Sequence, residues 1–355
     1  MKRFFSSEFL NNYKGLITSS QIFEKYLPRS GLTEDSLKWL LPDINSSYDL
    51  ESIHQGISKP TWDMLERGGK MWRGALCLIS GEALGAQKEE LLPLAASVEL
   101  IHNGSLICDD IEDSSEYRRG RPCTHKVFGV DVAINAGNLL YFLPLKIIKD
   151  MQLRGSVLKN IFEAYSEEMV HIHFGQCSDI VWNNSDFTPS EDQYFTMVSN
   201  KTSVLSRLAV KFALYYTQQP EQTQRSFVEF ADKLGKSFQV LDDVINLESE
   251  EYAKGRSYLG EDITEGKKTL IVIRALSQTK EPGRLKEILS MRTKNPSLVE
   301  EALEIIKSTD AIDYAKSAAQ EMVESAWSKL DPLLQPSEAK THLHLLSQLV
   351  VNRSS

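Results

Sequence analysis

The chain has 355 residues, and its 40 Lys and Arg residues against 49 Asp and Glu residues give a formal net charge of −9. This balance argues against a protein that binds nucleic acid through a broad basic surface. Charged residues interrupt every apolar run before it reaches the roughly 18 to 20 residues of a membrane span, so we expect no transmembrane segment.

The four cysteines lie far apart and form no C-x-x-C pair; they are Cys77, Cys108, Cys123 and Cys177. This spacing predicts neither a disulfide framework nor a structural zinc site, and it favours a reducing compartment, most simply the cytoplasm. The N-terminal sequence MKRFFSSEFL lacks the apolar stretch of a secretion signal. We expect an ordinary helix there, with organelle targeting as the alternative.

Apolar residues recur at helical spacing along most of the chain, which predicts an all-α fold in one large bundle. Residues 1–47 are broken by turn residues and are expected to form an N-terminal extension or a first helical layer, ahead of a main domain at 48–355. Helices are expected at 50–65, from the residue after Lys70 to Leu84, and at 90–113, 131–150, 157–181, 190–217, 221–250, 269–278, 298–307 and 310–331.

The strongest local signal is the acidic run Asp109-Asp110-Ile111-Glu112-Asp113, which closes a predicted helix. Asp109 and Asp113 are one turn apart and share a face, whereas Asp110 is rotated by about 100°. Their like charges repel, and a divalent cation between them would remove that cost. The same face becomes polar and then apolar toward Val98, as one wall of a deep pocket would require.

A second cluster follows at Gln239 to Asn246, where Asp242 and Asn246 again share one helical face beside an apolar stripe. Carboxylate and amide oxygens suit Mg²⁺, whose coordination is usually completed by water and substrate phosphates. For either acidic pair taken alone, the alternative to a metal site is an ordinary solvent-exposed helix face.

Basic residues follow both clusters, and a short glycine-containing segment precedes them. Cations next to paired carboxylates indicate a metal-bound anion such as a diphosphate. These cations are Arg118, Arg119 and Arg121 after the first cluster, and Lys254, Arg256, Lys267 and Lys268 after the second. Gly68-Gly69-Lys70 does not match a nucleotide phosphate loop, but it can bring Lys70 and Arg73 to one anionic group.

Over roughly positions 50 to 350 the chain resembles the trans-isoprenyl diphosphate synthases, and within them the eukaryotic geranylgeranyl type. The match comprises seven blocks in the family's order: Gly69-Lys70-x-x-Arg73, Glu99-Leu100-Ile101-His102, the first aspartate-rich run with Arg118-Arg119-Gly120, Gly175-Gln176-x-x-Asp179, Lys201-Thr202, Phe238-Gln239-x-x-Asp242-Asp243 and Glu265-Gly266-Lys267. The resemblance makes 48–355 an isoprenoid-synthase-like catalytic domain around a substrate cavity. It implies Mg²⁺-dependent condensation of isopentenyl diphosphate with an allylic diphosphate.

The resemblance also implies a role for individual residues. The metal ligands are Asp109, Asp113, Asp242 and Asn246, for three Mg²⁺ ions with substrate bound, with Mn²⁺ as a substitute. The isopentenyl diphosphate site comprises Lys70, Arg73, His102 and Arg119. The allylic diphosphate site comprises Arg118, Lys201, Thr202, Gln239, Arg256 and Lys267. Gly74 stands where the family usually has Pro, and Asn246 stands where it commonly has Asp.

The length of the product would depend on how deep the cavity is. Gly104 and Ser105 are small, which would leave the wall below Asp109 open along Ile101 and Val98. By resemblance, Tyr141, Phe142 and His173 form a floor that fits a twenty-carbon product; core aromatics are the alternative interpretation.

Other functions fit parts of this pattern. A farnesyl or longer polyprenyl diphosphate synthase would share the chemistry, and a terpene cyclase would share the fold but needs no second anion site. A non-catalytic partner subunit should have lost metal ligands, and this chain retains both clusters. Members of the family are commonly homodimers.

Overall fold

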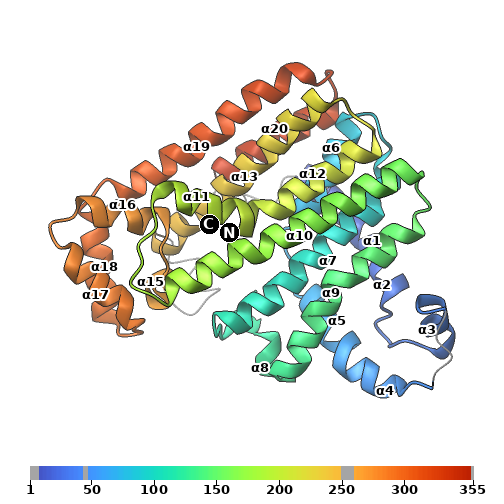
Figure 1. The fold of residues 1–355 in the computed structure, drawn as a ribbon, viewed down its shortest axis with the longest axis horizontal. Coiled ribbons are helices and arrows are strands. Elements are labelled where there is room, and N and C mark those ends of the chain that lie inside the picture. The colour runs from blue at the N-terminus through green and yellow to red at the C-terminus, as the bar shows by residue number, and fades with distance from the viewer. Residues whose placement is uncertain (1–7, 43–46, 249–259, 353–355) are drawn as a thin grey trace.

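The computed structural model of the protein describes residues 8–42, 47–248 and 260–352. Within these ranges the fold is all-α, as predicted, apart from one two-stranded hairpin. Long helices run side by side through the middle of the molecule, with α1–α4 at one end and α15–α18 at the other (Figure 1).

The N-terminal helices are α1 (Glu8–Ser19), α2 (Ile22–Tyr26) and α3 (Glu34–Leu40). They pack on the main bundle, because Leu10, Tyr13 and Ile17 of α1 are buried in the same hydrophobic core as α6 and α7. Next come α4 (Leu50–Ile53), a π-helical turn η1 (His54–Ser58) and α5 (Lys59–Glu66), which together form the helix predicted at 50–65.

The central bundle contains α6 (Trp72–Ala83), α7 (Lys88–Glu112), α8 (Thr124–Phe128), α9 (Val130–Asp150), α10 (Gly155–Asn183) and α13 (Glu221–Glu248). The helix predicted at 190–217 is divided into α11 (Glu191–Val198), a π turn η2 (Ser199–Ser203) and α12 (Val204–Tyr216). Between α7 and α8, β1 (Tyr117–Arg118) pairs with β2 (Arg121–Pro122), a hairpin that periodicity did not predict.

The C-terminal part comprises α15 (Glu261–Glu265), α16 (Leu270–Gln278), α17 (Pro282–Met291), α18 (Pro296–Lys307), α19 (Ala311–Leu330), a 3₁₀ turn η3 (Asp331–Leu333) and α20 (Glu338–Val351). Neither α17 nor α20 was predicted. The smaller of two hydrophobic clusters joins α16–α19 to α11 and α13, so this part continues the bundle.

Two helices, α7 and α9, are long and apolar enough to cross a membrane by length and composition alone. They pack against each other, and 67% and 44% of their most apolar stretches are buried inside the fold. Core helices of a bundle have the same character, so these two helices are weak evidence for a membrane span.

Candidate active site

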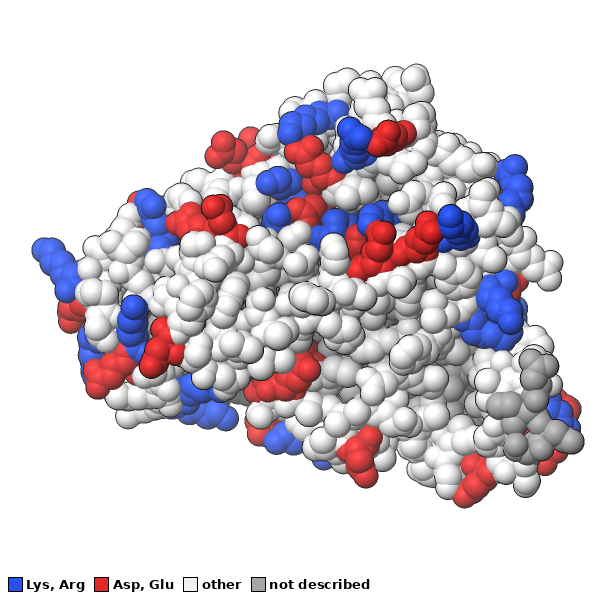
Figure 2. All heavy atoms as spheres, viewed as in Figure 1, with Lys and Arg blue, Asp and Glu red and all other residues white. Residues whose placement is uncertain are grey.

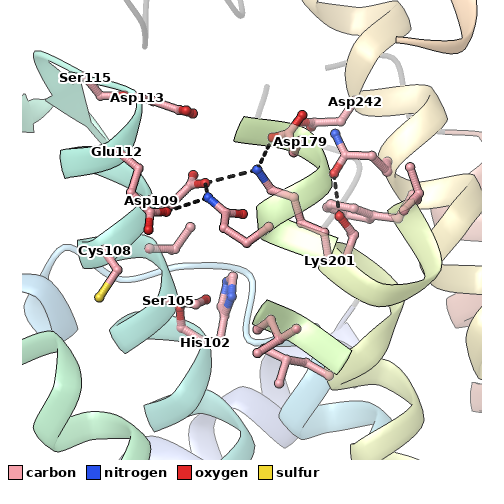
Figure 3. Close-up of a pocket in the computed structure, with 18 of the residues that line it drawn as sticks. His102, Ser105, Cys108, Asp109, Glu112, Asp113, Ser115, Asp179, Lys201 and Asp242 are labelled. Atoms are coloured by element: carbon pink, nitrogen blue, oxygen red, sulfur yellow. Dashed lines mark hydrogen bonds and ion pairs between the residues drawn. The ribbon is translucent and has the colours of Figure 1, made fainter. Parts of the chain in front are cut away.

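One cavity of about 710 Å³ collects most of the residues predicted to act on substrate. Figure 3 shows acidic side chains of α7 on one side of this cavity, with Asp179, Lys201 and Asp242 on the other. The predicted residues on its lining are Lys70, Arg73, His102, Ser105, Asp109, Asp113, Arg118, Arg119, Tyr141, His173, Lys201, Thr202, Gln239, Asp242, Asn246 and Lys267. Gly104 and Phe142 are not on the lining, and Arg256 lies outside the described residues.

The acidic end of α7 divides into two faces, as helical spacing predicts. Asp109 and Asp113 face the cavity together with Glu112. Asp110 is buried on the other side and accepts from Arg118 Nε at 2.7 Å. Asp110 therefore holds Arg118, while Asp109 and Asp113 remain directed at the cavity.

Two lysines neutralise the cavity-facing carboxylates from the opposite wall. Lys201 Nζ lies 3.1 Å from Asp109 Oδ1 and 2.5 Å from Asp179 Oδ2, and Lys267 Nζ lies 3.6 Å from Asp113 Oδ2. Burial alone would raise the pKa of Asp109, but Lys201, Arg118 and Lys267 outweigh it and lower that pKa. Burial raises the pKa of Asp113 to about 7, and the charge of Asp109 adds to the shift.

The second acidic cluster lies on α13, which passes the cavity opposite α7. Asp242 lines the cavity, while Asp243 is buried and accepts from Tyr194 and Gln239, each at 2.8 Å. Gln239 Oε1 accepts from Thr202 Oγ1 at 2.9 Å. Asn246 Oδ1 accepts from the backbone N–H of Asp262, so this side chain also fastens α15 to α13.

A second cationic part of the same cavity, which we call the anion pocket, lies beside the loop between α5 and α6. Gly68 has a φ of +74°, which favours glycine, and a Cβ on Gly69 would lie 2.9 Å from Arg119 Nη2. Arg119 therefore packs against this loop, and Lys70 and Arg73, which follow the loop, line the same cavity. Burial and the charges of Arg73 and Arg119 lower the pKa of His102, so its imidazole is neutral at pH 7.

Glu99 supports this pocket from within the bundle. Its carboxylate accepts the backbone N–H of Gly74 at 2.8 Å, a donor that the family's usual Pro would not have. A side chain at Gly74 would also meet Ile17 of α1. Gly74 is therefore compatible with this pocket and gives it one additional hydrogen bond.

The hairpin determines where the paired arginines point. Arg119 and Gly120 have φ values of +54° and +76° between paired Arg118 and Arg121, which is the pattern of a type I′ turn. Arg118 consequently turns toward Asp110, and Arg119 Nη1 turns toward Asn103 Oδ1 at 3.1 Å. Burial lowers the pKa of Arg119 to about 10, so it keeps its charge at pH 7.

The inner part of the cavity differs from the predicted open channel. Ile101 and Val98 are buried in the hydrophobic core and do not line the cavity. Gly104 packs against α9, because a Cβ there would lie 2.8 Å from Gly137 O and from Leu140 Cβ. Gly104 thus permits two helices to approach closely and does not widen the wall.

Two of the aromatic residues predicted to form the floor line the cavity. Tyr141 and His173 both line it, and their rings meet edge to face at 5.9 Å. Phe142 instead is 66% exposed on the outside of α9, because successive helical residues point about 100° apart. The structure therefore places two of the three predicted floor residues at the cavity.

Several lining residues received no role from the sequence. Asp179 binds Lys201, and Gln176 donates to Asp109 and Glu112 at 3.1 and 2.6 Å. Gln176 and Asp179 share a face of α10, so their spacing together with the family block could have identified them. The sequence could not predict the hydrogen bond from Arg119 to Asn103, because that contact depends on the hairpin that turns Arg119 toward α7.

The donor set of the cavity fits a hard divalent cation. Asp109, Asp113 and Asp242 offer carboxylate oxygens to the same cavity. Among the described residues, no three acidic, His or Cys side chains are grouped closely enough to hold a metal on their own. This arrangement fits Mg²⁺, which takes part of its coordination from water and substrate phosphate.

Comparisons with known proteins agree with this geometry. Residues 54–306 match the family model described as polyprenyl synthetase. A geranylgeranyl pyrophosphate synthase of Macrophomina phaseolina is 36% identical over 276 residues, covering 78% of this chain and 82% of the relative. One from Dictyostelium discoideum is 31% identical over 290 residues, covering 82% and 92%.

A solved structure shows the same fold. The geranylgeranyl pyrophosphate synthetase of Pyrococcus horikoshii superposes with a TM-score of 0.83 at 28% identity, covering 98% of both chains. The family match, the relatives and the fold agree with the resemblance seen in the sequence. The chain belongs to the polyprenyl synthetase family and is a trans-prenyltransferase.

Proposed function

We propose that this chain condenses isopentenyl diphosphate with an allylic diphosphate to make geranylgeranyl diphosphate. The observation that carries the proposal is that one cavity has two separate cationic sites beside its acidic cluster. Lys70, Arg73 and Arg119 form one, and Arg118, Lys201 and Lys267 form the other. A reaction between two diphosphates needs both sites, whereas a cyclase needs only one.

The allylic diphosphate is assigned to the acidic side of the cavity. Asp109, Asp113, Asp242 and Asn246 would hold Mg²⁺ there, three ions in all with substrate bound and with Mn²⁺ as a substitute. Bound Mg²⁺ supplies charge that stabilises the departing diphosphate. Lys201, Lys267 and Arg118 add positive charge where that negative charge develops, and Thr202 and Gln239 offer hydrogen bonds.

The isopentenyl diphosphate is assigned to the pocket of Lys70, Arg73, His102 and Arg119. The three cations bind its diphosphate, and neutral His102 offers a hydrogen bond without changing the total charge. When the allylic carbon–oxygen bond breaks, its electrons leave with the diphosphate. The alkene of isopentenyl diphosphate then attacks the allylic carbon, and a proton is lost to the released diphosphate.

The apolar lining supports a cationic intermediate by excluding water. Trp72 and Phe238 both line the cavity, and their rings stack at 5.1 Å. Their electron-rich faces favour positive charge nearby, as the position of Arg73 over both rings shows. We propose that Tyr141 and His173 end the cavity at a twenty-carbon product.

A second copy of the chain is proposed to cover the C-terminal half of α10 and the adjacent face of α9. Figure 2 shows that this part of the surface carries few charges. The exposed apolar side chains there are Val130, Ile134 and Phe142 of α9, and Val170, Phe174 and Val181 of α10. An apolar face of this kind fits the homodimer expected from the family. We further propose that the enzyme acts in the cytoplasm.

A product assay tests the proposed reaction. Purified protein is incubated with Mg²⁺, labelled isopentenyl diphosphate and, in turn, dimethylallyl, geranyl or farnesyl diphosphate, and products are identified with and without phosphatase treatment. We expect geranylgeranyl diphosphate, and chelation of the metal should abolish it. Cyclic hydrocarbon from the allylic diphosphate alone would indicate a cyclase, and no turnover with any primer would indicate a partner subunit.

A further inference from the structure

The π turn η2 interrupts the helix that crosses the cavity, and it carries Lys201 and Thr202. In a π turn the backbone bonds to the fifth residue instead of the fourth, and such turns are frequent at functional sites. Lys201 Nζ reaches Asp109 and Asp179, and Thr202 Oγ1 reaches Gln239. The position of both groups therefore depends on how this turn is held.

A buried ion network outside the cavity holds the turn at its first residue. Arg207 Nη1 donates to the backbone oxygen of Ser199 at 2.7 Å and to Ser199 Oγ at 2.9 Å. The same nitrogen donates to Asp232 Oδ1 at 2.9 Å. Ser199 Oγ also donates to Asp232 Oδ1. One guanidinium thus fixes the start of the π turn to α13.

The network also reaches the other end of the turn and the neighbouring helix. Ser203 Oγ donates to the backbone oxygen of Asp232 at 2.9 Å. On α10, Glu168 is 1% exposed and accepts from Arg207 Nε at 3.2 Å and from Arg207 Nη2 at 2.6 Å. The guanidinium of Arg207 therefore links α12 to α10 and α13. A lysine cannot reproduce this, because its single ammonium group lacks the planar set of donors.

Two glycines let the neighbouring helices close on the turn. A Cβ on Gly175 of α10 would collide with the backbone of Asn200 and Lys201. A Cβ on Gly235 of α13 would lie 2.6 Å from Ser203 Cα. Because backbone lies against backbone on both sides, a shift of the turn is transmitted directly to Lys201.

We propose that Arg207, fixed by Glu168 and Asp232, is a positioning residue that sets the π turn and so places Lys201 Nζ and Thr202 Oγ1 for the allylic diphosphate. It touches neither substrate. This inference rests on the proposed role of Lys201 and Thr202 at the allylic site.

The test compares Arg207→Lys with Lys211→Met. Lys211 Nζ lies 2.8 Å from Glu168 Oε1, so the control removes a positive charge beside the same buried carboxylate, at a residue of α12 that lies beyond the turn. Arg207→Lys should lower kcat/KM for the allylic diphosphate on the order of 100-fold, because small displacements of positioning groups have effects of that size. It should leave KM for isopentenyl diphosphate within about twofold, and Lys211→Met should change neither.

Gly235→Ala tests the same idea without touching any charge. The added methyl group pushes on Ser203, so we expect the same selective loss for the allylic diphosphate. Gly283→Ala on α17 is the matched control, because a Cβ there would meet nothing within 4 Å. This second variant decides the question if Arg207→Lys does not fold, as judged by circular dichroism and Tm.

Lys201→Met separates a failure of this inference from a failure of the proposed site. If Lys201→Met leaves the allylic kinetics unchanged, the allylic assignment of Lys201 is wrong, and the positioning role falls with it. If Lys201→Met is impaired while folded Arg207→Lys and Gly235→Ala are normal, the inference alone is overturned. Equal losses for both substrates in Arg207→Lys would also overturn it, because they indicate a general structural effect.

Discussion

Asp109 and Asp110 are adjacent on α7 and both lie near Arg118, but we expect different functions because Asp109 lines the cavity and Asp110 does not. Asp109 faces the cavity, whereas Asp110 is 1% exposed and binds Arg118. We expect Asp109 to act on substrate through a metal ion, and we expect Asp110 to hold Arg118 in position. The distinction rests on an angle of about 100° between successive helical residues.

Asp109→Ala is expected to lower kcat by at least about 100-fold while the protein stays folded, because it removes a charge that acts chiefly in the transition state. Steady-state kinetics across a Mg²⁺ titration would measure the loss. Asp310→Ala, which removes an exposed carboxylate paired with Arg274, is the control and should be nearly normal. Near-normal turnover in Asp109→Ala would contradict the metal assignment.

Tyr141→Ala is expected to lengthen the product, because it removes one of the two rings proposed to end the cavity. Phe142→Ala removes a ring of similar size from the outer surface of the same helix, so it should leave product length unchanged. Mass spectrometry of the dephosphorylated products distinguishes the two. Longer products from Phe142→Ala and not from Tyr141→Ala would reject this floor.

At the scale of elements, helical periodicity predicted more of the site than any other signal. It placed Asp109 with Asp113 and Asp242 with Asn246, because the spacing of a helix fixes which side chains share a face. It could not predict that Lys201 meets Asp179, since that contact depends on how α10 and η2 pack. The type I′ hairpin was too short for periodicity, although its Arg119-Gly120 turn orients two arginines.

The floor shows a second limit of sequence reasoning. Ile101 and Val98 follow the helical face of Asp109, yet they are buried in the core because α7 packs against its neighbours there. Periodicity gives the face of one helix but not where the next helix closes on it. The depth of a cavity is therefore a property of packing.

The N-terminal helix α1 contacts the proposed isopentenyl diphosphate site, a contact that the sequence did not indicate. Lys14 Nζ donates to the backbone oxygen of Gly69 at 2.7 Å, and Ile17 packs beside Gly74. Lys14→Met should raise KM for isopentenyl diphosphate by about threefold to tenfold, which corresponds to the net contribution of one typical hydrogen bond. KM for the allylic diphosphate should not change.

Initial rates at varied concentrations of each substrate would measure this effect. Thr18→Ala is the control on the same helix, because its hydroxyl bonds only to the backbone of α1. An unchanged KM for isopentenyl diphosphate in Lys14→Met would mean that the loop keeps its position without α1.

At the scale of the whole molecule, buried charges link stability to pH. Burial would raise the pKa of Asp232, but Lys236, Ser199 and Arg207 outweigh it and lower that pKa below its usual value. A carboxyl with a lowered folded-state pKa stabilises the protein above its unfolded pKa, about 3.9, and this contribution is lost as pH falls through the folded-state pKa.

Asp232→Asn should therefore lower the free energy of unfolding at pH 7 by about 1 to 3 kcal/mol. The difference from wild type should be the same at pH 7 and pH 5.5 and should shrink below about pH 4. Urea unfolding at these pH values, followed by circular dichroism, gives the comparison. A difference that grows toward acid pH would contradict the direction of the shift.

The apolar face of α9 and α10 gives a test of assembly. In a twofold interface each residue occurs twice, so one substitution places two charges in the contact. Phe174, which is 69% exposed, belongs to the C-terminal half of α10, and Phe174→Asp should convert the proposed dimer to a monomer. Leu345→Asp on α20 is the control, because it adds the same charge at an exposed apolar residue elsewhere. Light scattering after size exclusion measures the masses; a monomeric wild type, or a dimeric Phe174→Asp, would reject this face as the interface.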